Sequence, residues 1–122
     1  MASKQNKKNI LILDDGLFFS DRFSGILKSN GHIVDVVSTD EKINADVITS
    51  ANLMIINLGS KSVDIIQFVH SLANNTNIPI LAFVGHKLVD TYSKEFNGFA
   101  TVLSNGTINR DLLTLVEQLT TT

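Results

Sequence analysis

The sequence has no cysteine and only one proline among its 122 residues. Without cysteine the chain can form no disulfide, no thiolate nucleophile and no cysteine-based zinc site, which agrees with a reducing cytoplasm. The single proline, Pro79, opens an apolar run, where its missing N–H does not interrupt a strand. Apolar runs such as 10–13 are far too short for a signal or membrane-spanning segment, so we expect a cytoplasmic protein that does not enter a membrane.

Positive charge is also scarce outside the beginning of the chain. The formal net charge is -2, and Lys4, Lys7 and Lys8 lie in the first eight residues, so the remainder carries -5. A nucleic-acid-binding domain normally presents a basic face, so nucleic acid is not an expected partner. We interpret residues 1–8 as a solvated N-terminal tail, 9–119 as a single domain of ordinary size, and 120–122 as a C-terminal tail.

Short apolar runs alternate with segments of helical spacing. The runs are rich in Ile, Val and Leu, as is typical of strands that are covered on both faces, and they occupy 9–13, 32–37, 53–56, 79–84 and 100–104. Apolar stripes at helical spacing occupy 19–27, 43–51, 65–73, 88–96 and 108–119. This order predicts an α/β fold, a five-stranded parallel sheet doubly wound in the flavodoxin-like (βα)5 manner. Asn30-Gly31 and Asn97-Gly98 are expected to end two of the helices, and Thr39, Ser60 and Thr107 to cap three of them.

Ligands of such sheets bind beyond the carboxyl ends of the strands, so those positions are the candidate site. Asp14 and Asp15 end the first strand. Adjacent carboxylates repel each other and favour a divalent cation such as Mg²⁺, although an aspartate also suits the positive end of a helix. Asn57 ends the third strand. Its neutral amide cannot accept a phosphoryl group as a carboxylate can, but it can hold a turn by hydrogen bonds.

The remaining strand ends offer little chemistry. Val84 has neither a hydroxyl nor a charge, and Asn105 with Gly106 suits a turn. The stretch LDDGLFF has one glycine where a dinucleotide fingerprint needs three. No Ser-His-Asp arrangement has credible spacing. We therefore do not expect an enzyme.

Four stretches together resemble the receiver domain of two-component response regulators (the CheY-like family) over about residues 8–119: ILILDDGLFFSDRFSGILKSNGHIVDVV, NLMIINLGS, IPILAFVGH and GFATVLSNG. The resemblance implies an acidic pair that binds Mg²⁺, and Asp14 and Asp15 match it. It also implies a phosphoacceptor aspartate at the end of the third strand, a Thr or Ser, a switch aromatic and a lysine. In their places stand Asn57, Val84, Val102 and Asn105.

These departures favour a degenerate pseudo-receiver that acts as a phosphorylation-independent protein–protein interaction module. This interpretation requires no cofactor, and its partner is a protein of a signalling pathway. The resemblance implies a partner surface within 87–119, where we single out Leu88, Tyr92 and Leu113. The alternative for these three residues is an ordinary place at the edge of the core.

Two other functions remain open at this stage. The first is a receiver that still binds Mg²⁺ at Asp14 and Asp15 and switches in response to a ligand. The second is a small-ligand sensor that uses the strand-end crevice, where Gly16, Gly59 and Gly85 would permit close backbone approach.

Overall fold

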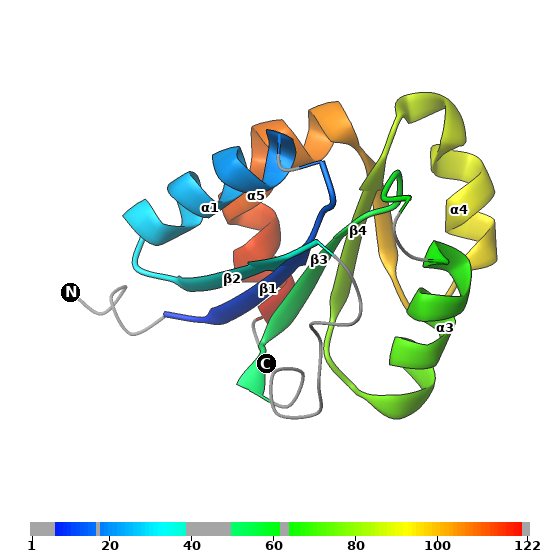
Figure 1. Ribbon diagram of the computed structural model, residues 1–122, viewed down its shortest axis with the longest axis horizontal. Coiled ribbons are helices and arrows are strands. Elements are labelled where there is room, and N and C mark those ends of the chain that lie inside the picture. Colours follow the sequence, from blue (N-terminus) through cyan, green and yellow to red (C-terminus); the bar gives the residue numbers. More distant parts are fainter. Residues whose placement is uncertain (1–6, 17, 39–49, 62–63, 121–122) are drawn as a thin grey trace.

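The computed structural model describes residues 7–16, 18–38, 50–61 and 64–120. Its elements follow one another along the chain as shown in Figure 1. They are β1 (Asn9–Leu13), α1 (Phe18–Ser29), β2 (Ile33–Val37), β3 (Leu53–Asn57), α3 (Ile65–Asn75), β4 (Ile80–Val84), the 3-10 turn η3 (His86–Leu88), α4 (Val89–Glu95), β5 (Thr101–Ser104) and α5 (Asn105–Thr120). No helix within these residues is long and apolar enough to cross a membrane.

The five strands form one parallel sheet in the order β2-β1-β3-β4-β5. The predicted fold class is thereby confirmed. Strand order reverses around β1, which pairs with β2 on one side and β3 on the other. In sheets of this kind the crevice at such a reversal is the usual ligand position. The carboxyl ends of β1 and β3 therefore border the candidate site.

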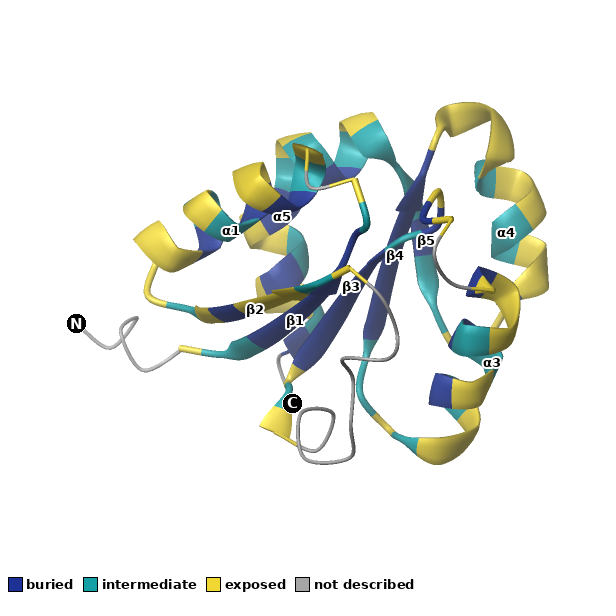
Figure 2. Cartoon of the chain, in the orientation of Figure 1, coloured by how far each residue is buried: buried dark blue, intermediate teal, exposed yellow. Residues whose placement is uncertain are grey.

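Helices cover both faces of the sheet, α1 and α5 on one and α3 and α4 on the other (Figure 1). Successive strand residues point to opposite faces, so each strand feeds two cores. Ile10 and Ile12 pack in the cluster that includes Phe23 of α1. Leu11 and Leu13 pack in a second cluster, which includes Val69 of α3 and Phe96 at the end of α4. Figure 2 shows the consequence: the central strands β1, β3 and β4 are buried, whereas the edge strand β2 and the outer helix surfaces are largely exposed.

Several predicted boundaries shift by a residue or two. The predicted helix at 88–96 is α4, preceded by the 3-10 turn η3. The helix predicted over 43–51 falls almost entirely outside the described residues. Gly31 and Gly98 have φ of 91° and 93°, so both glycines adopt the left-handed conformation expected after a helix. Thr120, assigned above to the C-terminal tail, is the last residue of α5, where its buried hydroxyl donates to the Val116 carbonyl at 2.7 Å.

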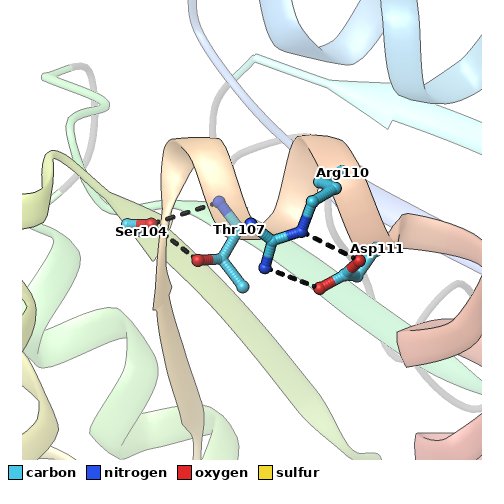
Figure 3. Close-up of polar contacts among 4 residues, drawn as sticks. All are labelled: Ser104, Thr107, Arg110 and Asp111. Carbon is cyan, nitrogen blue, oxygen red and sulfur yellow. Dashed lines mark hydrogen bonds and ion pairs between the residues drawn. The ribbon is translucent and has the colours of Figure 1, made fainter.

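Two predicted helix caps are wrong. Asp64, not Ser60, caps α3, because its Oδ1 accepts from the Gln67 backbone N–H at 3.3 Å. Ser104, not Thr107, caps α5 (Figure 3), where its Oγ accepts from the Thr107 N–H at 3.1 Å. The helix begins at Asn105, earlier than its apolar stripe indicates. Thr39 lies outside the described residues.

Figure 3 also shows the bend of α5. Asp111 departs from helical geometry, with φ of -112° and ψ of 20°. The Arg110 guanidinium binds the Asp111 carboxylate through Nε at 3.2 Å and Nη2 at 3.0 Å. That contact lowers the pKa of Asp111. Because both side chains are exposed, the pair contributes little to stability.

The Ser104 cap leads to a first prediction. Ser104→Ala removes the acceptor of the Thr107 N–H and should lower the free energy of unfolding by about 1 kcal/mol. The melting temperature should fall by about 4 °C. Thermal unfolding followed by circular dichroism measures this. Ser104→Asp, which keeps a capping oxygen, is the control, and equal loss in both variants would contradict the cap.

A second prediction concerns pH. The Lys8 N–H donates to His32 Nδ1 at 3.1 Å, and burial, followed by the charge of Lys8, lowers the pKa of His32 below its ordinary 6.5. As the pH falls, His32 of the unfolded chain is therefore protonated before His32 of the folded protein. The contribution of neutral His32 to the free energy of unfolding is complete above pH 6.5, its ordinary pKa. It is lost as the pH falls towards the lowered pKa of the folded state.

Urea unfolding between neutral pH and about pH 5 tests this linkage, because the midpoint then tracks stability. We expect the free energy of unfolding of the wild type to fall more steeply with acidification than that of His32→Gln. Parallel curves for the two proteins would show that His32 has the same pKa in both states.

Candidate functional site

The loops that follow β1 and β3 meet through the side chain of Asp14, which is only 1% exposed. Asp14 Oδ1 accepts from the Gly16 N–H at 3.1 Å and from Asn57 Nδ2 at 2.9 Å. Its Oδ2 accepts from the Ser20 N–H at 3.0 Å, in the first turn of α1. The side chain thus accepts from three protein donors, as a buried polar group requires.

Asn57 uses both ends of its amide. While Nδ2 donates to Asp14, Oδ1 accepts from the Gly59 N–H at 2.8 Å. The two contacts together assign the orientation of the amide. A Cβ at position 59 would lie 3.2 Å from Asn57 Oδ1, so glycine suits the tight turn. Asn57 therefore holds the β3–α3 loop and ties that loop to Asp14.

Asp15 makes the second connection between the same two loops. Its backbone N–H donates to Ser60 Oγ at 3.3 Å, and its Oδ2 accepts from the Lys61 backbone N–H at 2.6 Å. The loops are therefore joined directly by protein hydrogen bonds. The sequence did not predict the contacts of Ser20 and Ser60 with the acidic pair. Spacing along the chain does not indicate which groups meet across two loops.

The arrangement does not fit a Mg²⁺ ion as it stands. Mg²⁺ needs oxygen ligands in near-octahedral geometry, but Asn57 directs an N–H at the inner oxygen of Asp14, where a cation would be repelled. Lys61 likewise directs its N–H at Asp15 Oδ2. Among the described residues, no group of three or more His, Asp or Glu side chains is arranged to hold a metal.

The positions where the resemblance implies a hydroxyl, a switch aromatic and a lysine hold Val84, Val102 and Asn105. Val84 and Val102 are 5% and 8% exposed and belong to the α3/α4 side of the core. Asn105 begins α5, and its Oδ1 is buried without a hydrogen-bond partner. These positions supply no hydroxyl and no cation near Asn57. The structure brings together Asp14, Asp15 and Asn57, but builds no reactive constellation from them.

The three residues singled out for a partner surface lie on the 3-10 turn η3 (Leu88), on α4 (Tyr92) and on α5 (Leu113). Leu88 and Leu113 are 48% and 39% exposed. Tyr92 is half-buried, packs on the core and stacks on Phe96 with ring centroids 5.8 Å apart. Helices α4 and α5 contact β5 from opposite faces of the sheet (Figure 1), so the residues border one sheet edge.

No protein-family model matches the sequence, and no curated protein matches it significantly. Solved structures do resemble it. A two-component response regulator from Clostridium difficile has 16% identity and a TM-score of 0.75 over 93% of this chain and 95% of its own. The beryllofluoride-activated NtrC4 receiver domain dimer has 21% identity and a TM-score of 0.75 over 91% and 95%.

The chain has the fold of a response-regulator receiver domain. A third structure, NtrX from Brucella abortus in complex with ATP, has 16% identity and a TM-score of 0.79 over 93% of this chain. This chain spans only 27% of NtrX. Identities this low establish the receiver fold alone, so function has to be argued from the site.

Proposed function

We propose that this chain is a receiver-fold signalling module that acts by binding a protein partner and is independent of phosphorylation. The observation that carries the proposal is the hydrogen bond from Asn57 Nδ2 to Asp14 Oδ1 at 2.9 Å. It places a neutral amide, already engaged at both ends, at the position where the resemblance implies a phosphoacceptor carboxylate. An amide is a poor nucleophile, so Asn57 does not accept a phosphoryl group as a carboxylate at this position would.

A receiver works as a two-state element that a phosphoryl group biases, and a ligand biases two states only through different affinities for them. Val84 and Val102 offer a phosphoryl group no hydrogen bond, and Asn105 offers no positive charge. Any switching of this module is therefore driven by its partner or by another ligand.

The same contacts support a module that requires no cofactor. In a carboxylate cluster a cation offsets the repulsion between negative charges. Here the Asn57 amide and the backbone N–H groups of Gly16, Ser20 and Lys61 bind the two aspartates instead. We propose that the site is complete without Mg²⁺ and that the module works in the cytoplasm.

The decisive experiment is an amide NMR titration with Mg²⁺ at millimolar concentration, followed by beryllium fluoride as a mimic of the phosphoryl group. We expect the resonances of Asp14, Asp15, Asn57 and Asn105 to stay in place through both additions. Shifts that spread through residues 87–119 after beryllium fluoride would overturn the proposal. A shift of Asp14 and Asp15 with Mg²⁺ alone would overturn only its cofactor-free part.

Leu113 provides a third prediction. It lies off the buried stripe of α5, so Leu113→Glu should change the free energy of unfolding by less than about 0.5 kcal/mol while weakening partner binding tenfold or more. Affinity capture from extract of the source cells, quantified against wild type, measures the effect. Ile66→Glu on α3, at a side chain that is also exposed (41%), is the matched control. Equal capture by both variants would exclude Leu113 from the surface.

A further inference from the structure

A cavity of about 430 Å³ lies between the first turns of α1 and α5, separate from the Asp14–Asn57 contact. It is lined by Phe18, Phe19, Arg22, Asn105, Gly106 and Asn109. Its volume falls within the range typical of small-molecule sites. None of the lining residues is acidic, and none takes part in the contacts that join the two loops.

One wall of the cavity is aromatic and is anchored in the core. Phe18 is 75% exposed, more than any other large apolar side chain that the structure describes. Its ring meets Phe19 edge to face at 5.0 Å, and Phe19 meets the fully buried Phe83 in the same manner at 5.3 Å. An exposed ring with this support offers a fixed surface for a second flat ring.

The polar groups of the cavity are hydrogen-bond donors. Arg22 donates through Nε to Asn109 Oδ1 across the gap between α1 and α5. This contact leaves the terminal nitrogens of the guanidinium and the Asn109 amide nitrogen for another acceptor. Asn105 also lines the cavity, and its buried Oδ1 has no hydrogen-bond partner. Phe18, Phe19 and Arg22 come from α1, and Asn105 and Asn109 from α5, so the lining combines aromatic rings, one positive charge and two amides.

We infer that this cavity binds a small planar aromatic carboxylate. Its ring lies against Phe18, and its carboxylate accepts from the Arg22 guanidinium and the neighbouring amides. A guanidinium matches a carboxylate in both charge and geometry. This ligand site adds a chemical input to the receiver fold and does not depend on whether Asn57 can be phosphorylated.

The test is an amide NMR titration with 2-naphthoate as the probe. We expect shifts at Phe18, Arg22, Gly106 and Asn109, and binding at least tenfold weaker for Arg22→Gln. Lys28→Gln removes a positive charge from the last turn of the same helix and should bind as wild type does. The neutral analogue 2-naphthamide and the aliphatic octanoate should each bind at least tenfold more weakly than 2-naphthoate.

Gly106→Leu tests the cavity without removing any of its polar groups. A Cβ at Gly106 meets no heavy atom within 4 Å, so the position tolerates a larger side chain. Because Gly106 lines the cavity, we expect leucine there to weaken binding at least tenfold. Gly25→Leu on α1 has the same open surroundings and should bind as wild type does. Absence of shifts at millimolar 2-naphthoate, equal binding of 2-naphthamide, or equal effects of the Gly106 and Gly25 variants would overturn the inference.

Discussion

Asn57→Asp should lower the free energy of unfolding by about 2–4 kcal/mol near pH 7.5 in the absence of divalent cations. The substitution removes the Asn57 amide, whose Nδ2 donates to Asp14 Oδ1 at 2.9 Å, and puts a second carboxylate in its place. Two negative charges would then face each other, one of them on a side chain that is 1% exposed. Urea unfolding followed by circular dichroism measures the loss.

The same variant should acquire a dependence on divalent cations that we do not expect of the wild type. Mg²⁺ at millimolar concentration offsets the repulsion between the carboxylates and binds only the folded state, so it should restore part of the lost stability. Asn74→Asp adds a carboxylate at an exposed position of α3 and should change stability by less than about 0.5 kcal/mol. An Asn57→Asp protein as stable as wild type without Mg²⁺ would show that the amide does not stand in for a cation.

Asp14→Ala should be destabilising by about 3 kcal/mol, because it leaves buried donors without an acceptor. The Ser20 N–H and the Asn57 amide both donate to Asp14, and Ser20 is fully buried. Asp15→Ala should cost about 1 kcal/mol, because Asp15 is half-buried and water can reach the Lys61 N–H that it leaves.

The stabilities of Asp14→Ala and Asp15→Ala distinguish a structural role of the acidic pair from a role in holding a cation. If the pair served chiefly to hold a cation, both substitutions would relieve repulsion and stabilise the protein without metal. Asp14→Asn is the intermediate control, since its Oδ1 can still accept while its new N–H group opposes a donor. Equal stability of wild type and Asp14→Ala would contradict the structural role of Asp14.

Taken together, these contacts describe a receiver fold whose site is filled by its own side chains. Direct hydrogen bonds join the β1–α1 and β3–α3 loops at Asp14–Asn57, Asp15–Ser60 and Asp15–Lys61. Under the proposed function, an equilibrium between two states responds to molecules that contact other surfaces. The exposed Leu113 and the cavity beside Phe18 are the two such surfaces for which we offer tests.

Much of the fold follows from the sequence because periodicity is a local property. Runs such as Leu53–Ile56 are apolar at every position, and only a strand covered on both faces needs that pattern. The glycines after α1 and α4 mark left-handed backbone for an equally local reason. Caps were harder to predict, because Ser60 and Asp64 are both good capping residues and only the loop geometry selects between them.

The sequence by itself determined the α/β class, the strand positions and the lack of a carboxylate at Asn57, since each depends on residue type and spacing along the chain. Only the tertiary structure decided that the Asn57 amide donates to Asp14, that Lys61 contributes its backbone rather than its ammonium group, and that Phe18 and Asn109 line one cavity. Those contacts join residues that are 43, 46 and about 90 positions apart. Which groups meet over such separations is set by how the helices pack on the twisted sheet, and no periodicity along the chain encodes it.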